Sequence, residues 1–270
     1  MMILDRLKLD GKVALITGGG RGIGRGIANA LSEAGATVVV TARSPDQIQD
    51  TVEELTTQGR RAIAIQADVT KREDNERAVQ AVMSQFGRLD ILVNNAGGSG
   101  TTGPFLELTE EQFRRDMDLN MLSAFTLTQI ATPHLLESGG GSVINISSRA
   151  GSLAARGRLH YGVAKAALEH LTRRMAQELA PDIRVNALAI GTVLTAALQR
   201  GYDQGLDRAA MLASIPLERE GTIDEVGLAA LFLCAEGCYV TGQILYLDGG
   251  LQGAPSSDGG VRLRARKAGD

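Results

Sequence analysis

The sequence is poor in residues on which several protein classes depend. It has no tryptophan, two cysteines and three histidines in 270 residues. Cys234 and Cys238 are too few for a disulfide framework, and their spacing in LFLCAEGC is that of one helical face. We therefore expect reduced thiols in the core. The scattered histidines, His134, His160 and His170, argue against a metal site.

Long apolar runs and a strong charge imbalance are also missing. No segment approaches the ~18 consecutive apolar residues of a membrane-spanning helix. The first residues, MMILDRLKLDGK, lack the apolar core of a signal peptide. The formal net charge of -3 gives no reason to expect a nucleic-acid surface. We therefore expect a cytoplasmic protein that binds no membrane, metal or nucleic acid.

Glycine is abundant, with 33 residues, and short β-branched segments alternate with amphipathic ones. The expected strands are 12–17, 36–42, 61–69, 89–97, 141–148, 183–190 and 243–249, and the expected helices are 22–35, 46–59, 74–86, 110–138, 161–179 and 224–235. Nearly continuous Val/Ile/Leu strands indicate a parallel sheet buried on both faces. The alternation predicts an α/β fold, a single Rossmann-type doubly wound parallel sheet with helices on both faces.

No linker divides the chain, so we predict one dinucleotide-binding and catalytic domain over residues 1–252. Residues 191–216 are polar and irregular, which favours a mobile lid. The stretch 253–270 is rich in Gly and Ser and then basic, which predicts a flexible tail. A contact arm to a second subunit is the alternative for that tail.

TGGGRGIG, Thr17 to Gly24, follows the first strand and opens the first helix. Glycines there allow a sharp turn and a close approach of the backbone to a pyrophosphate. The unpaired N–H groups and the positive end of the helix dipole then favour an anion. A glycine-rich loop at the first strand-to-helix junction of an α/β chain predicts a dinucleotide site.

YGVAK, Tyr161 to Lys165, places a phenol and an ammonium on one helical face. A tyrosine with an ordinary pKa of about 10 is almost fully protonated at neutral pH. A nearby ammonium favours the phenolate, so we expect Lys165 to lower the pKa of Tyr161. The pair is either a proton-transfer device or a surface pair of no consequence.

Several motifs occur in an order that resembles the short-chain dehydrogenase/reductase family in its compact form, from about Lys8 to Leu251. TGxxxGxG matches at Thr17, Gly18, Gly22 and Gly24, NNAG matches at Asn94 to Gly97, and the catalytic set matches at Asn120, Ser148, Tyr161 and Lys165. The resemblance implies hydride transfer between a nicotinamide and a carbonyl or alcohol. The implied cofactor contacts are Gly18, Arg21, Gly22, Ile23, Gly24, Arg43, Asp68, Val69, Asn95, Ala96, Gly97, Tyr161, Lys165 and Thr195.

In this resemblance Tyr161 is the general acid or base and Ser148 steadies the substrate oxygen. Lys165 also holds the nicotinamide ribose, and Asn120 anchors a water that links the lysine to solvent. Asn120 could instead be a capping or buried structural residue. Ser147 is the rival of Ser148, but a regular strand turns its side chain to the opposite face.

The end of the second strand decides between NAD(H) and NADP(H). It reads TARS, with Arg43 and no acid before Asp46, where an NAD site usually offers a carboxylate. A guanidinium can grip a 2′-phosphate that a carboxylate would repel. Arg21 in the glycine loop could reach the same phosphate. The pair favours NADP(H) over NAD(H).

Three other functions stay open. A 3-oxoacyl-[acyl-carrier-protein] reductase needs a basic patch for its acidic carrier, for which the candidates are Arg114, Arg115, Arg173 and Arg174. A non-catalytic NADP(H)-binding regulator would carry a broken catalytic set. A serine hydrolase would use Ser148 with His160, but there is no G-x-S-x-G elbow and no identifiable supporting acid. We expect His160 at the pocket rim or facing solvent.

The chain departs from the family after its sixth strand, where Ile190 stands in place of the usual proline. Thr192 and Thr195 could still contact the cofactor. Substrate specificity is expected in loops 98–104, 149–160 and 191–216, but the substrate itself is not readable. The resemblance further implies a homo-oligomer, a tetramer or dimer, built through helices around 105–138 and 161–179.

Overall fold

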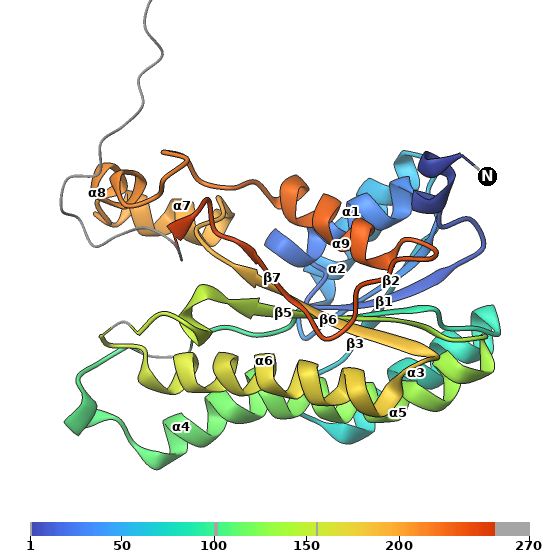
Figure 1. Cartoon of the computed structure of the whole chain (residues 1–270), viewed down its shortest axis with the longest axis horizontal. Helices are drawn as coiled ribbons and strands as arrows, with labels where there is room; N and C mark the ends of the chain where they lie inside the picture. Colours follow the sequence, from blue (N-terminus) through green and yellow to red (C-terminus); the bar gives the residue numbers. More distant parts are fainter. Residues whose placement is uncertain (1, 100–101, 155, 252–270) are drawn as a thin grey trace, which may run out of the picture.

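The structure is a computed structural model that describes residues 2–99, 102–154 and 156–251. Seven strands form one parallel sheet in the order β3-β2-β1-β4-β5-β6-β7 (Figure 1). They are β1 (Val13–Thr17), β2 (Thr37–Ala42), β3 (Ala62–Gln66), β4 (Ile91–Asn94), β5 (Gly141–Ser148), β6 (Ile183–Ile190) and β7 (Ile244–Leu247). The order reverses between β1 and β4. The predicted fold class, a doubly wound Rossmann-type sheet, is confirmed.

Helices cover both faces of this sheet. Figure 1 shows α1, α2 and α9 on one face and α3, α4, α5 and α6 on the other. The helices are α1 (Gly22–Glu33), α2 (Pro45–Thr57), α3 (Arg72–Phe86), α4 (Glu110–Met117), α5 (Ser123–Glu137), α6 (Leu159–Leu179), α7 (Ala196–Asp203), α8 (Arg208–Ala213) and α9 (Ile223–Cys234). Short 3₁₀ turns are η1 (Ile3–Leu7), η2 (Phe105–Glu107) and η4 (Arg149–Gly151), and η3 (Asp118–Leu122) is a π turn.

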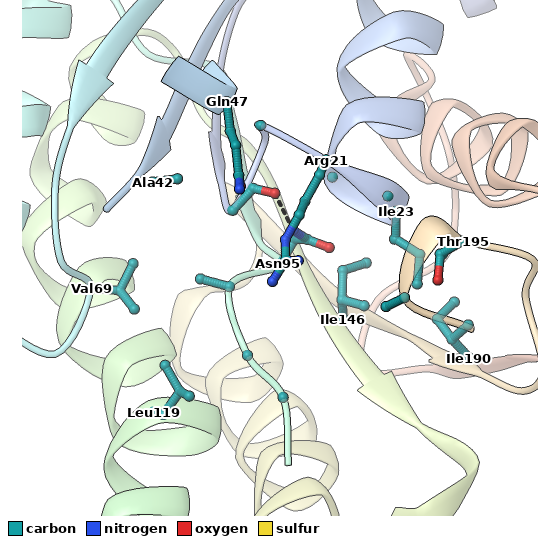
Figure 2. A pocket seen from close by; sticks show the side chains of 18 of the residues that line it. Arg21, Ile23, Ala42, Gln47, Val69, Asn95, Leu119, Ile146, Ile190 and Thr195 are labelled. Atoms are coloured by element: carbon teal, nitrogen blue, oxygen red, sulfur yellow. Dashed lines mark hydrogen bonds between the residues drawn. The ribbon is translucent and has the colours of Figure 1, made fainter. Parts of the chain in front are cut away.

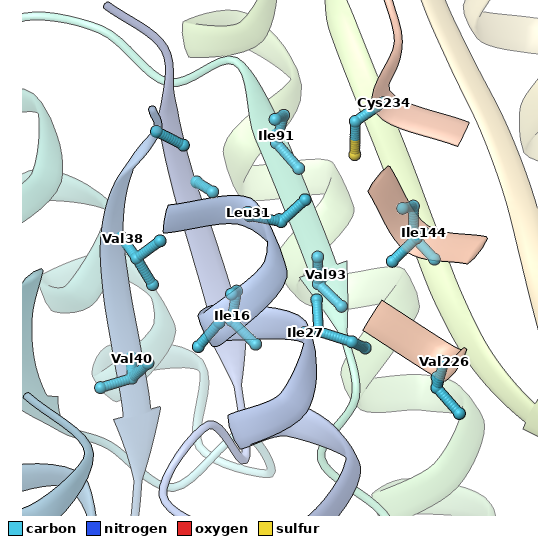
Figure 3. Packing of buried hydrophobic residues seen from close by; sticks show 14 of the residues in the cluster. Ile16, Ile27, Leu31, Val38, Val40, Ile91, Val93, Ile144, Val226 and Cys234 are labelled. Atoms are coloured by element: carbon cyan, nitrogen blue, oxygen red, sulfur yellow. The ribbon is translucent and has the colours of Figure 1, made fainter. Parts of the chain in front are cut away.

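The core has one apolar cluster on each side of the sheet, because successive strand residues point to opposite faces. Ile16 belongs to the cluster under α1 and α9, and Leu15 to the one under α3, α5 and α6. In Figure 3, Ile27 and Leu31 of α1 point toward the strands of the first cluster. Burial on both faces explains why these strands are almost continuously apolar.

Helices α1 and α9 approach each other closely at two glycines. A Cβ added at Gly26 would lie 2.6 Å from the carbonyl oxygen of Ile223, and one at Gly227 would lie 2.8 Å from Ala30 Cβ. Neither position has room for a side chain. This contact holds the start of α1, and with it the glycine loop, against α9.

The predicted element bounds differ from the structure at informative places. β4 is shorter than the expected strand 89–97, because the chain after Asn94 leaves the sheet. The helices expected over 110–138 are α4 and α5, joined by the π turn η3. The prediction of an irregular segment over 191–216 was wrong, since α7 and α8 lie within it. The domain boundary at 252 and the tail 253–270 lie outside the described residues.

Both cysteines are free, as expected. Their predicted placement on one helical face was wrong, because α9 ends at Cys234 and Cys238 lies beyond it. Burial raises the pKa of the Cys234 thiol to about 12. Among the described residues, no helix is both long enough and apolar enough to span a membrane.

Candidate active site

A cavity of about 440 Å³ lies at the carboxyl ends of the central strands (Figure 2). Open α/β sheets bind ligands at this edge, where the strand order reverses. All the cofactor contacts that the resemblance implies line this cavity, and so does Ser148, whereas Thr192 does not. Asn120 lies behind the wall formed by Gly97 and Gly98. The structure therefore brings the two ends of the predicted site together.

The glycine loop forms one end of the cavity. Gly18 and Gly22 have φ of 64° and 52°, in the left-handed region that glycine adopts without strain. A Cβ at Gly24 would overlap the carbonyl oxygen of Gly18. The Asn95 side chain donates to the carbonyl oxygens of Thr17 (2.8 Å) and Gly18 (3.1 Å), which ties the end of β4 to the loop. The N-terminus of α1 is thus held open toward the cavity, as an anion site requires.

Positive charge dominates the part of the cavity next to this loop. Arg21 and Arg43 are exposed and line it, and Figure 2 shows Arg21 projecting into the cavity. Asp68 lines it too, but its Oδ1 accepts hydrogen bonds from Thr70 N (3.0 Å) and Oγ1 (2.7 Å). Among the described residues that line the cavity, Asp68 is the one carboxylate. The cationic side chains that line it number four, Arg21, Arg43, Lys165 and Arg200.

The other end of the cavity holds Ser148, Tyr161 and Lys165. Ser148 ends β5, and its Oγ accepts a hydrogen bond from Ala150 N at 3.2 Å. Tyr161 and Lys165 lie one turn apart on α6, with Lys165 Nζ 5.7 Å from the centre of the Tyr161 ring. Lys165 is buried and donates to the carbonyl oxygen of Ile146 at 2.8 Å. Strand and helix together place a hydroxyl, a phenol and an ammonium in one cavity.

The expected effect of Lys165 on Tyr161 was wrong for the chain alone. Burial raises the pKa of Tyr161, and the groups that oppose this rise are the Ser148 hydroxyl and the positive charge of Arg158. Lys165 is not among them, and its ammonium is hydrogen-bonded to the carbonyl oxygen of Ile146. Burial also lowers the pKa of Lys165 to about 8. Near neutral pH, Tyr161 is therefore a protonated phenol.

Asn120 lies in the π turn η3, a distortion that often marks functional sites. Its side chain accepts from Gly98 N (2.9 Å) and donates to Gly98 O (3.0 Å) and Asp116 O (3.0 Å). A Cβ at Gly97 would lie 2.7 Å from Asn120 Oδ1 and 3.2 Å from Lys165 Nζ. Asn120 and Lys165 thus border the same small space. A water anchored there by Asn120 stays a prediction.

The side chain of Ser147 is directed away from Ser148, as the strand pattern predicts. Its hydroxyl donates to Glu169 Oε1 at 3.0 Å and is buried. Tyr246 donates to the other carboxylate oxygen of Glu169, at 3.4 Å. The Ser147 hydroxyl is thus engaged with α6, which leaves Ser148 as the serine that accompanies Tyr161.

The expectation that His160 faces solvent was wrong. It is 2% exposed, so it does not face solvent, and it has the acid that the sequence did not reveal. Its Nε2 faces Asp116 Oδ2 at 3.4 Å. This places the imidazole against α4 rather than in a serine-hydrolase arrangement. His160 does border a second cavity, of about 530 Å³, with residues from 102–112 and 156–159.

Sequence reasoning missed Asp116 and Arg200. Asp116 precedes Asn120 by four residues, so helical spacing could have placed it beside Asn120. Arg200 lines the cavity from α7, in a segment that was expected to be irregular. Ile190, which replaces the family's proline, ends β6 and lines the same cavity.

The fold and the cavity define a Rossmann-type nucleotide-binding protein with a Ser-Tyr-Lys set at one end of its site. A family model described as Enoyl-(Acyl carrier protein) reductase matches residues 18–252. The 7alpha-hydroxysteroid dehydrogenase of Escherichia coli is 40% identical over 248 residues, which are 91% of this chain and 96% of that protein. The chain belongs to the short-chain dehydrogenase/reductase family of oxidoreductases.

Two further comparisons agree with this family. The solved structure of 7alpha-hydroxysteroid dehydrogenase complexed with NADH and 7-oxo glycochenodeoxycholic acid superimposes with a TM-score of 0.87 at 39% identity. It covers 93% of this chain and 98% of that chain. The 3-oxoacyl-[acyl-carrier-protein] reductase FabG of Staphylococcus epidermidis is 36% identical over 243 residues, 89% of this chain and 98% of that protein.

Proposed function

We propose that the chain is a cytoplasmic NADP(H)-dependent oxidoreductase that transfers a hydride between the nicotinamide and a carbonyl or secondary alcohol carbon. The observation that carries this proposal is the cavity itself. Its glycine loop suits a pyrophosphate, and its far end holds Ser148, Tyr161 and Lys165. A nicotinamide cofactor bound there would supply or accept the hydride, which no side chain can do.

The residues of the cavity fit such a cofactor. Gly24 leaves no space for a Cβ beside Gly18 and Asn95, so the loop packs tightly at the N-terminus of α1, where a pyrophosphate would bind. Asp68 and Val69 would flank the adenine, and Asn95, Ala96 and Gly97 would line the cofactor's path toward α6. Lys165 would hold the nicotinamide ribose, and Thr195 would close the site from α7.

The preference for NADP(H) rests on this chain's own arginines. Arg43 follows β2, where a carboxylate would bind the ribose 2′-hydroxyl of NAD, and Arg21 lines the same region. Two guanidinium groups suit a 2′-phosphate, because each can form charge-assisted bonds with its oxygens. The related 7alpha-hydroxysteroid dehydrogenase was solved with NADH. The preference therefore rests on Arg21 and Arg43 alone.

The proton is handled by Tyr161. Because burial keeps the phenol protonated near neutral pH, it is in the form that donates to a carbonyl oxygen during reduction. The Ser148 hydroxyl would bond the same oxygen and stabilise its developing charge. Alcohol oxidation requires the phenolate instead, which Ser148, Arg158 and a bound oxidised nicotinamide would favour.

Carrier-bound 3-oxoacyl thioesters are the second candidate substrate, favoured by the FabG relative. The basic patch that would receive an acidic carrier is weaker than its sequence indicates. Arg114 forms an ion pair with Glu110 (2.6 Å) and Arg174 with Glu178 (3.7 Å), each on its own helix. A small carbonyl compound is therefore the preferred substrate class.

We also propose that copies of the chain associate through α5 and α6. These helices carry large apolar side chains that a single copy leaves partly exposed, Leu122 at the end of η3, Phe125 and Leu136 on α5, and Leu159 and Val163 on α6. Light scattering of the purified chain should give the mass of a dimer or tetramer. The mass of a monomer would contradict this proposal.

The test of the function is oxidation of NADPH and of NADH against ketones, aldehydes, steroids, sugars and acyl thioesters. We expect turnover of free carbonyl compounds, faster with NADPH. Turnover confined to carrier-bound thioesters would favour the second candidate. Tight NADPH binding without turnover of any compound would instead indicate a non-catalytic regulator.

A further inference from the structure

Asp116 and His160 form a buried pair beside the proposed catalytic residues. Asp116 is 0% exposed and His160 2%, and Oδ2 of Asp116 lies 3.4 Å from Nε2 of His160. Among the described residues, none donates a hydrogen bond to either carboxylate oxygen of Asp116. A buried carboxylate without donors is costly unless a positive charge faces it. The side chain that faces Oδ2 is the imidazole of His160.

The pair joins the two segments that carry the proposed catalytic groups. Asp116 is one turn before Asn120, whose amide donates to the Asp116 carbonyl oxygen at 3.0 Å. His160 directly precedes Tyr161 at the start of α6. The contact between Asp116 and His160 therefore fixes the turn that carries Asn120 against the helix that carries Tyr161 and Lys165.

The charge of Asp116 reaches both catalytic groups of α6. It raises the pKa of Tyr161 in the same direction as burial, and it raises the pKa of Lys165 against the effect of burial. Arg158 acts on Tyr161 in the opposite sense, and Glu169 raises the pKa of Lys165. A protonated His160 beside Asp116 would cancel part of the effect of the carboxylate.

Other charged groups near this end of α6 lie toward solvent. The exposed ones are Glu110, Glu111, Arg114 and Arg115 of α4, Asp118 of η3, and Arg156 and Arg158 before α6. Arg149 of η4 is half-buried. Water screens exposed charges. Of these groups Arg158 still lowers the pKa of Tyr161, by more than Asp116 raises it. Asp116 and His160 are the buried ionisable side chains closest in the sequence to Asn120 and Tyr161.

We propose that Asp116 and His160 act as an ionised positioning pair, which holds the Asn120 turn against α6 and sets the protonation of Tyr161. The inference rests on the proposed role of Tyr161 as the proton donor. Neither residue touches the reacting atoms. Their effect on the reaction passes through Tyr161, by charge, and through Asn120, by position.

The direct test is the ionisation of Tyr161 in the full chain without substrate, followed by the near-ultraviolet absorbance of tyrosinate. Subtracting the curve of Tyr161→Phe isolates this residue among the four tyrosines. Asp116→Asn should lower the pKa of Tyr161 by about one unit, because a raising charge is removed. His160→Gln should raise it, because Asp116 loses its counter-charge.

The double variant Asp116→Asn with His160→Gln replaces the ion pair by two neutral amides of similar size. Its Tyr161 pKa should lie between those of the two single variants. Asp118→Asn is the matched control, since it removes an exposed carboxylate from the same turn, and it should leave the curve unchanged. In the active chain, the pH at which carbonyl reduction declines should move with the Tyr161 pKa.

Shifts of opposite sign in the two single variants would support the pair. Unchanged ionisation in both, with only lower melting temperatures, would show a merely structural contact and overturn the proposal. A shift of the same sign in both would also overturn it. The titration needs no turnover, so the absence of activity in the wild-type chain would count against the proposed function and leave this test intact.

Discussion

At the residue scale, Lys165 is an ammonium that the fold buries almost completely. Burial lowers its pKa from the usual 10.5 to about 8, so the folded chain loses this proton before the unfolded chain does. Between pH 8 and 10.5 the unfolded state binds more protons, and the unfolding free energy due to Lys165 rises with pH. Below pH 8 the cost of burying the charge is constant.

We therefore expect the wild-type chain to gain stability relative to Lys165→Met as the pH rises through this window, by ~3 kcal/mol at most. Denaturant unfolding at a series of pH values measures the difference. Comparing the two chains removes the contributions of Tyr161 and Cys234, which titrate in both. Lys71→Met, at an exposed position, is the control. A difference between wild type and Lys165→Met that does not change with pH would contradict the buried ammonium.

Arg43 is the residue on which the cofactor preference depends most. Replacing it by Asp puts a carboxylate where the 2′-phosphate of NADP would lie. We expect the ratio of kcat/KM for NADPH over NADH to fall at least about tenfold, because a charge-assisted contact becomes a repulsion. Arg61→Asp, at an exposed arginine outside the cavity, should leave the ratio unaltered. An unchanged ratio in Arg43→Asp would remove this arginine from the phosphate site.

Single residues also show where prediction from the sequence stops. Ser148, Tyr161 and Lys165 were found because they match the catalytic set of the family that the sequence resembles, and helical spacing placed Tyr161 and Lys165 on one face. The direction of the Tyr161 pKa shift was missed, because it depends mainly on burial, which the sequence pattern does not give. The Asp116 partner of His160 was missed because the two are far apart in the sequence and meet only when α4 packs on α6.

At the element scale, the packing of α1 on α9 depends on Gly227. An alanine there gains about 1 kcal/mol of helix propensity. Its Cβ, however, would lie 2.8 Å from the Gly26 carbonyl oxygen and from Ala30 Cβ, and overpacking typically costs ~1–3 kcal/mol. Backbone and Cβ atoms cannot rotate away, so we expect Gly227→Ala to be destabilising in denaturant unfolding.

Gly201→Ala in α7 is the control for this prediction. Its Cβ would meet Leu206 Cδ2 at 3.6 Å, an ordinary contact, so helix propensity should act alone and stabilise. Opposite signs at Gly227 and Gly201 are the expected result. Stabilisation by both substitutions would show that α1 and α9 are not in the close contact described.

Elements with strong periodicity were predicted well, and β5 and β6 have the expected bounds. The segment after β6 was not, because α7 and α8 are short and each begins at a side-chain cap. Thr195 Oγ1 accepts from Leu198 N, and Asp207 Oδ1 accepts from Ala210 N. Such caps are local signals that the polar composition of the segment obscured.

At the scale of the whole molecule, the order of the strands creates the site. The chain builds β1, β2 and β3 outward and then returns to place β4 on the other side of β1. The loops after these strands diverge there, and the cavity between them runs from the glycine loop to α6. Strand alternation predicted this arrangement, whereas the loops around the substrate depend on side-chain packing that the pattern does not encode.

The measurement that tests the account most directly is turnover by Tyr161→Phe, which removes one oxygen from the cavity and little else. We expect NADPH to bind with nearly unchanged affinity, followed by its fluorescence, while carbonyl reduction falls by ~100-fold or more, the usual loss for a general acid. Turnover close to that of the wild-type chain, with NADPH still bound, would show that another group delivers the proton.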